Sequence, residues 1–182
     1  MRQRLMQGMG KLVLVAAIGG SIGVLGCDFP DRPPRVGDEA PAFTATLLDT
    51  GEQVSLADYQ GDVLLVNIWA TYCAPCRFET PYLVSVFEEH ADRGFKVVGI
   101  SVDSNNSLTA VTRFLEEMEV SYDILLDPDM ISTDVFAAIG LPATFILDRD
   151  GVIRFMQYGP ILEDDPMFLE TLDEILSREA QP

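Results

Sequence analysis

Two cysteines, Cys73 and Cys76, stand three positions apart in the stretch WATYCAPC over residues 69–76. Cysteine pairs at this spacing form small disulfides, bind metal ions or exchange electrons with other thiols. A structural disulfide across so short a loop adds little stability, because that stabilisation grows with loop length. A zinc site needs about four ligands, and the chain offers a single histidine, His90, besides the pair. Thiol-disulfide exchange therefore explains the spacing best.

The elements on either side favour the same chemistry. Val63 to Ile68 is an uninterrupted hydrophobic run apart from Asn67, typical of a strand covered on both faces. A helix beginning near Ala74 would place Cys73 at its N-terminus, where free backbone N–H groups and the helix dipole stabilise a thiolate. Cys73 is therefore the candidate nucleophile. Cys76, one turn further on, is the candidate resolving thiol that attacks the mixed disulfide.

Strand-like and helix-like segments alternate along the rest of the chain after an N-terminal hairpin. This order predicts an α/β fold with a mostly parallel sheet that ends in an antiparallel edge. Gly51 marks the hairpin turn, and Ser55 caps a short turn after it. The predicted strands are 43–48, 54–56, 63–68, 95–102, 122–126, 143–147 and 152–158, and the predicted helices are 77–91, 108–118, 129–139 and 167–176. Pro81 interrupts the first helix and predicts a kink there.

The N-terminus reads as an export signal. Three basic residues and no acidic one occur among the first 26 positions, and Leu12 to Leu25 carries no charge. The residues around Cys27 resemble the lipobox of bacterial lipoproteins, which implies lipid attachment at Cys27. An uncleaved membrane anchor is the alternative. The expected organisation is a signal peptide or anchor over residues 1–26, a Pro-rich linker over 27–41 and one domain over 42–182.

The charge of the chain excludes one class of partner. Lys and Arg number 12 against 29 Asp and Glu, which gives a formal net charge of -17 over 182 residues. Such a surface repels nucleic acid and anionic lipid headgroups. We therefore expect no nucleic-acid partner.

The stretch WATYCAPC followed by RFETP resembles the active-site region of the thioredoxin superfamily, and more closely its TlpA/ResA-like, membrane-tethered thiol-disulfide oxidoreductases. The resemblance runs from Val36 to Ile175 and includes GDEAP at 37–41 and GLPATF at 140–145. It implies a thioredoxin-like fold, with a central mixed sheet flanked by helices and an N-terminal hairpin. It also implies a central helix-strand insertion over Leu108 to Leu126.

The resemblance further implies three residues that contact the substrate. Pro142 would follow a cis peptide bond and lie against the disulfide, although a trans proline that begins a strand is the plain alternative. Leu141 would offer its backbone to an extended substrate segment. Trp69 would shield one side of the site, or simply fill the core.

Glu79 is the implied proton acceptor. It stands three positions after Cys76, and a buried carboxyl there would have a raised pKa and could take the proton that Cys76 must lose. A surface charge is the alternative interpretation. Asn67 occupies the place where cytosolic thioredoxins carry a buried Asp, and Asn cannot titrate, which leaves Glu79 or water for this task.

The implied activity is reduction of disulfides in exported proteins, such as apocytochrome c or copper-site assembly factors. A redox-active Cys73-Cys76 disulfide would be the only redox group, with no cofactor and no metal. A membrane-bound electron donor of the DsbD/CcdA-like kind would restore the dithiol. The domain would sit in the cell envelope, tethered to the membrane, facing the periplasm or the outer side of the cytoplasmic membrane.

Three other functions fit the sequence less well. A peroxiredoxin-type thiol peroxidase shares the fold but has Thr-x-x-Cys, whereas Thr71 is only two positions before Cys73. A copper-delivery chaperone with this fold resembles CxxxC with a distant His, and neither is present. A DsbA-like oxidase more readily has His between its cysteines, where this chain has Ala74-Pro75.

Overall fold

The structure is a computed structural model that describes residues 32–178. Cys27 and the predicted signal segment lie outside these residues. Within the described range no helix is long and apolar enough to cross a membrane. In chain order the elements are β1 (Thr44–Leu47), β2 (Gln53–Ser55), the 3-10 helix η1 (Leu56–Tyr59), β3 (Val63–Trp69), α1 (Ala74–His90), η2 (Ala91–Arg93), β4 (Phe95–Ser101), η3 (Asn105–Ser107), α2 (Leu108–Glu117), β5 (Asp123–Leu126), α3 (Ile131–Val135), β6 (Ala143–Leu147), β7 (Ile153–Tyr158) and α4 (Pro166–Arg178).

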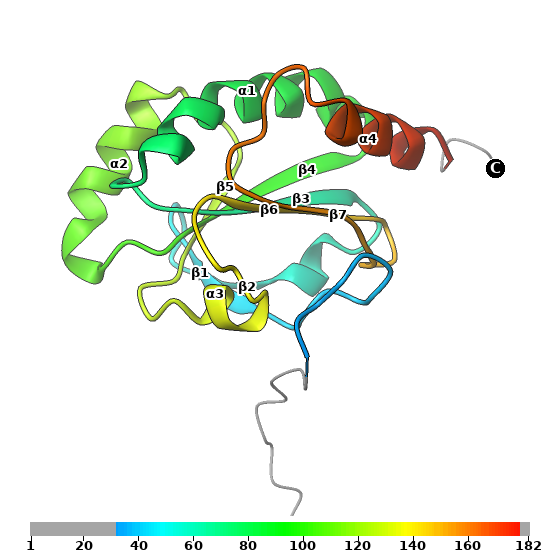
Figure 1. Cartoon of the computed structure of the whole chain (residues 1–182). Coiled ribbons are helices and arrows are strands. Elements are labelled where there is room, and N and C mark those ends of the chain that lie inside the picture. Colours follow the sequence, from blue (N-terminus) through cyan, green and yellow to red (C-terminus); the bar gives the residue numbers. More distant parts are fainter. Residues whose placement is uncertain (1–31, 179–182) are drawn as a thin grey trace, which may run out of the picture.

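A seven-stranded mixed sheet runs through the middle of the molecule (Figure 1). Its strand order is β2-β1-β5-β4-β3-β6-β7. The central strands β3, β4 and β5 are parallel, whereas β1, β2, β6 and β7 each pair antiparallel with their neighbours. The thioredoxin-like α/β fold predicted from the sequence is thereby confirmed. The insertion supplies α2 and β5, and β5 joins the N-terminal hairpin to the central strands.

Strand β3 is buried on both faces, as its hydrophobic run predicts. Because side chains alternate along a strand, Val63 and Leu65 pack in the cluster that includes α1 and α4, whereas Leu64 and Val66 pack in the cluster on the other side. Figure 1 shows α1 and α4 above the sheet and α3 below it. Asn67 continues the first of these two series, so it faces α1.

The hairpin and its cap follow the sequence prediction. Gly51 has φ +75° in the turn between β1 and β2, a conformation that glycine adopts without strain. Ser55 accepts a hydrogen bond from the backbone N–H of Ala57, and the carboxylate of Asp58 accepts one from the N–H of Ser55. The two bonds form a capping box that begins η1.

Two helices differ in length from the prediction. Helix α1 begins at Ala74, where the cysteine pair predicts its start and three residues before the predicted range 77–91, and it continues through Pro81 to His90. Helix α3 covers only 131–135 of the predicted 129–139. The residues that bound it, Met130 and Ala137, have φ values of 58° and 50°. These left-handed conformations end a right-handed helix on either side.

Part of the predicted linker contacts the sheet. The backbone N–H of Gly37 donates to the carbonyl of Ile153, and the N–H of Ala40 donates to the carbonyl of Gly151. Glu39 forms a bridge with Val152. The edge beside β7 is thus partly covered at this end.

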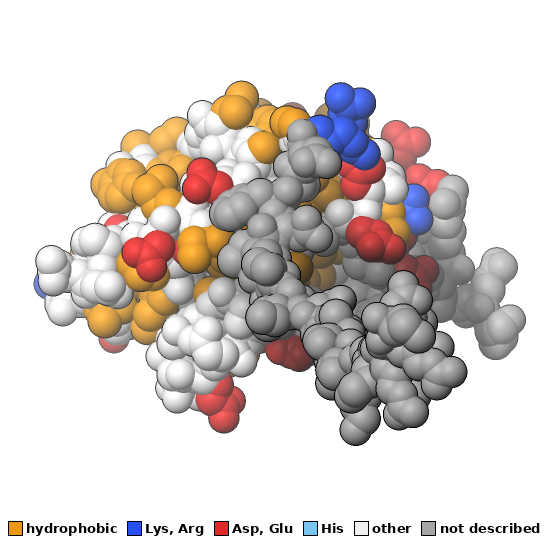
Figure 2. All heavy atoms as spheres, turned by 90° about the horizontal axis from the view of Figure 1, so that it is seen from below, with side chains coloured by type: hydrophobic (Ala, Val, Ile, Leu, Met, Phe, Trp, Pro, Cys, Tyr) orange, Lys and Arg blue, Asp and Glu red, His pale blue; other side chains and the backbone are white. Residues whose placement is uncertain are grey.

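Acidic side chains are spread over the face seen in Figure 2, whereas Lys and Arg side chains gather mainly near one end of the view. No continuous basic surface is visible there. This distribution agrees with the formal charge of -17.

Candidate active site

Cys73 and Cys76 lie where β3 leads into α1, as the sequence predicts, and they form a disulfide with their Cα atoms 5.3 Å apart. Cys73 is the N-cap of α1, and its Sγ accepts the backbone N–H of Cys76 at 3.2 Å. Ala74 and Pro75 are the first two helical residues, and the missing N–H of Pro75 costs little in this first turn. Cys73 retains 8% exposure and Cys76 none. Of the two cysteines, Cys73 is therefore the one that keeps some exposed surface.

Glu79 is buried, with 1% of its surface exposed, and it has no cationic partner among its hydrogen bonds. Burial raises the pKa of its carboxyl to about 7, and hydrogen bonds from Ile161 and Asn67 hold it from rising further. The carboxylate accepts the Asn67 amide and the backbone N–H of Ile161, each at 2.8 Å. It is therefore a group that can gain or lose a proton near neutral pH.

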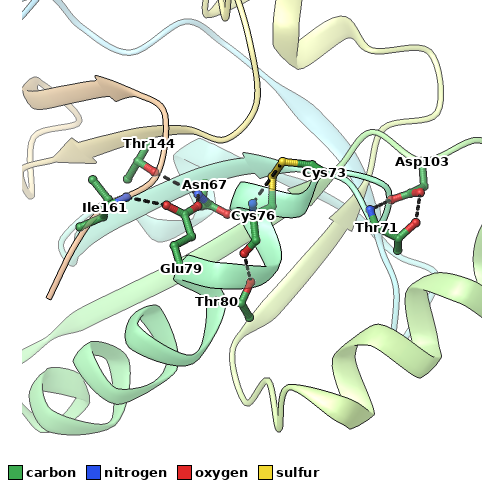
Figure 3. The surroundings of a disulfide bond; sticks show 9 residues. All are labelled: Asn67, Thr71, Cys73, Cys76, Glu79, Thr80, Asp103, Thr144 and Ile161. Carbon is green, nitrogen blue, oxygen red and sulfur yellow. Dashed lines mark hydrogen bonds between the residues drawn. A yellow bond between two sulfur atoms is a disulfide. The ribbon is translucent and has the colours of Figure 1, made fainter.

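Asn67 links Glu79 to the neighbouring strand. Its Nδ2 donates to Oε1 of Glu79 at 2.8 Å and to Oγ1 of Thr144 at 3.0 Å (Figure 3). Thr144 lies opposite Asn67 in the β3-β6 register. The Glu79 carboxylate is thus held directly by Asn67 of β3 and by Ile161 of the loop after β7. Strand β6 contributes indirectly, because Thr144 accepts the second hydrogen bond of the Asn67 amide. The sequence identified Asn67 and Glu79 separately but gave no sign of the roles of Thr144 and Ile161.

Helix geometry places Glu79 on the same side of α1 as Cys76, because residues three apart share a face. Figure 3 shows the Glu79 carboxylate pointing to Asn67 and Ile161 rather than to the sulfurs. The hydroxyl of Thr80 donates a hydrogen bond to the backbone carbonyl of Cys76 at 2.8 Å and so stabilises the same turn of α1.

The residues that the family resemblance assigned to substrate binding lie in three different settings. The Leu141–Pro142 peptide bond is cis, and Pro142 is buried while Leu141 is half-buried. Trp69 is buried and stacks on Phe114 of α2, with ring centroids 4.6 Å apart. Trp69 therefore belongs to the buried core, in the same cluster as Cys73 and Cys76, and does not lie open to solvent.

Helix α2 reaches the active-site helix through Phe114. The guanidinium of Arg77, the residue after Cys76, lies 5.1 Å from the centre of the Phe114 ring and forms a salt bridge with Glu117 at 3.0 Å. The Phe114 ring thus lies between the Arg77 guanidinium and the Trp69 indole and contacts both. The insertion is in this way attached directly to the site.

Large apolar side chains are exposed next to the site in sequence: Tyr72 before Cys73, Phe78 after Cys76, and Ile139 ahead of Leu141. Among residues 32–178 no group of three or more His, Cys, Asp or Glu is arranged to hold a metal ion. The predicted lipid attachment at Cys27 falls outside the described residues.

Comparison with known proteins places this site among thiol-disulfide oxidoreductases. Residues 36–156 match the model of the AhpC/TSA family. The thioredoxin-like protein YneN of Bacillus subtilis is 35% identical over 130 residues, covering 71% of this chain and 75% of that protein. The thiol-disulfide oxidoreductase ResA of Bacillus cereus is 25% identical over 146 residues, covering 79% and 83%. A crystal structure of a thiol:disulfide interchange protein of the thioredoxin family from Chlorobium tepidum superposes with a TM-score of 0.63 at 30% identity, covering 81% of this chain and 99% of that one.

Proposed function

We propose that this chain, which belongs to the AhpC/TSA family and is a thiol-disulfide oxidoreductase, acts as a reductase of disulfides in exported proteins. The observation that carries the proposal is the pairing of Cys73, which caps a helix N-terminus and keeps 8% exposure, with a buried Glu79 whose pKa is about 7. No cation lies between the cysteines, where Ala74 and Pro75 stand, to favour the thiolate so strongly that the disulfide becomes a strong oxidant.

In the proposed reaction the Cys73 thiolate attacks one sulfur of the substrate disulfide. A bond forms between Cys73 and the substrate, the substrate disulfide breaks, and the sulfur that leaves takes up a proton. Cys76 then loses its proton to Glu79 and attacks Cys73. The second substrate sulfur leaves as a thiolate and takes up a proton, so two electrons have passed to the substrate and the Cys73–Cys76 disulfide remains.

The proposed setting is the cell envelope, with the domain tethered through the N-terminal segment by lipidated Cys27 or an uncleaved anchor. Residues 1–27 begin with basic residues, continue with an uncharged stretch and end in a cysteine, and this pattern supports export. The proposed proton acceptor is Glu79, and the proposed substrate contacts are Trp69, Leu141 and Pro142, as the family resemblance implies. A DsbD/CcdA-like membrane protein is the proposed electron donor, and apocytochrome c or copper-site assembly factors are the proposed substrates.

The reduction potential of the purified full chain tests the direction of electron flow. We expect a value below about -200 mV, in the range of reducing members of the fold, and a value near about -120 mV would identify an oxidant instead. In cells, the Cys76→Ser variant should accumulate mixed disulfides through Cys73, and mass spectrometry of the adducts identifies the substrates. The Cys73→Ser variant is the matched control and should trap none of them.

The match to the AhpC/TSA family also makes thiol peroxidase activity a second candidate function that can be tested. Against it, Thr71 lies two and not three positions before Cys73 and hydrogen-bonds to Asp103. Turnover of hydrogen peroxide by the reduced chain, at a rate above that of free dithiol, would support the peroxidase.

A further inference from the structure

Asp103 is a buried carboxylate just beyond the end of β4, beside the loop that leads to Cys73. It is 6% exposed. Its Oδ2 accepts the backbone N–H of Thr71 at 2.9 Å, and its Oδ1 accepts the Thr71 hydroxyl at 2.6 Å (Figure 3). The hydroxyl of Ser101 donates to Oδ2 at 3.0 Å. Both carboxylate oxygens thus accept hydrogen bonds from Thr71, in the segment that precedes Cys73, and Oδ2 accepts a further one from Ser101 at the end of β4.

The partners of Asp103 show why a carboxylate is needed. Three donors converge on two oxygens, and all three are neutral groups. An ionised carboxylate accepts on both oxygens, whereas an amide accepts on one and presents a donor at the other. Hydrogen bonds to a charged acceptor are also the stronger kind.

Thr71 lies inside the turn that delivers Cys73 to the helix. The backbone N–H of Cys73 donates to the carbonyl of Ala70 at 3.1 Å, and the N–H of Val102 donates to the carbonyl of Trp69 at 3.0 Å. The turn is therefore bonded at its start to Val102, the residue that follows β4, and in its middle to Asp103. Within residues 32–178, the hydrogen bonds of Cys73 itself all lie inside its own helix and turn.

We propose that Asp103 is a positioning residue for the nucleophile: by holding both donors of Thr71, it keeps Cys73 at the N-cap of α1. A thiolate at that place is stabilised by the free N–H groups of the first turn. Loosening the turn removes part of this stabilisation, so the Cys73 thiol becomes harder to ionise and attacks more slowly. The inference rests on thiol-disulfide exchange at Cys73 and on no particular substrate.

The test measures the pH profile of Cys73 alkylation by iodoacetamide in the reduced full chain carrying Cys76→Ser, with the alkylated peptide quantified by mass spectrometry. Asp103→Asn and Thr71→Val should each lower the rate at pH 7 about three- to tenfold and move the profile to higher pH. Thr71→Ser keeps both donors and should retain the wild-type profile. The double variant should be no slower than Asp103→Asn alone.

Two results would overturn the proposal. A faster reaction in Asp103→Asn with Thr71→Val unchanged would mean that Asp103 acts through its negative charge and not through the turn. Unchanged profiles in both would mean that the turn holds Cys73 without Asp103. Thermal unfolding of each variant is recorded alongside, and if Asp103→Asn does not fold, the Thr71→Val and Thr71→Ser pair decides alone. Because alkylation needs no protein substrate, failure here leaves the proposed reductase function untouched.

Discussion

Replacing Asn67 by Leu removes the side-chain donor to Glu79 while keeping the branched shape and the number of heavy atoms of the side chain. The Asn67 amide and the Glu79 carboxylate are 2.8 Å apart, and both residues are almost fully buried. Water therefore has little room to replace the lost bond. The Ile161 backbone N–H remains as a donor to the other oxygen.

The size of the effect follows from the strength of that bond. A hydrogen bond to a charged group contributes about 1.5–3 kcal/mol, and about 1.4 kcal/mol corresponds to one pKa unit. Since the Asn67 bond favours the ionised form, its loss should raise the pKa of Glu79 by about one to two. At pH 7 the carboxyl of the variant would then be largely protonated and unable to accept a proton from Cys76.

The titration of Glu79 can be followed by carbon-13 NMR of its carboxyl in the oxidised protein, from pH 4 to 10. Thr144→Val is the matched control, because it removes the other partner of Asn67 and leaves the bond to Glu79 intact. It should move the pKa of Glu79 much less than Asn67→Leu does. An unchanged pKa in Asn67→Leu would refute the reasoning that this amide stabilises the carboxylate.

Three further predictions concern stability. The folded-state pKa of Glu79 is raised from 4.5 to about 7, so the folded chain binds more protons than the unfolded one between these values. The contribution of Glu79 to the free energy of unfolding should therefore fall by about 3 kcal/mol in total as pH rises from about 4.5 to 7. Urea unfolding of Glu79→Gln should lack this pH-dependent loss of stability. Parallel curves of unfolding free energy against pH for the two proteins would contradict the prediction. Phe114→Ala should cost about 3–5 kcal/mol of unfolding free energy, because it leaves a cavity against Trp69, and a loss below about 1 kcal/mol would show that α2 does not support the site. Gly99→Ala should also destabilise, since its Cβ would lie 2.8 Å from Cδ1 of Ile124 and 2.9 Å from Nε1 of Trp69, and a thermal midpoint equal to that of the wild type would count against this packing.

The features that could be predicted from the sequence are local ones. The run Val63 to Ile68 and the spacing of Cys73 and Cys76 depend on neighbours a few positions apart, so the strand, the helix start and the cysteine pair were all predictable. Helix α3 was predicted too long, because the residue types Met130 and Ala137 do not mark the left-handed backbone that they adopt on either side of it.

The supports of the site are non-local and could not be read in advance. Thr144 lies 77 positions from Asn67, and Ile161 lies 82 positions from Glu79. The Ile161 contact uses a backbone N–H, which every residue except proline has, so no sequence signal marks it. Asp103 stands 32 positions from Thr71, and only the parallel pairing of β3 with β4 brings the two together.

The division of labour between the two cysteines is the central claim, and it can be measured in one experiment. Reduced Cys76→Ser and Cys73→Ser variants are mixed with a peptide disulfide, and the adducts are located by mass spectrometry over time. Cys76→Ser should form a stable mixed disulfide at Cys73 rapidly, whereas Cys73→Ser should react far more slowly, because Cys76 is fully buried. Equal rates in the two variants, or a faster reaction at Cys76, would contradict the account.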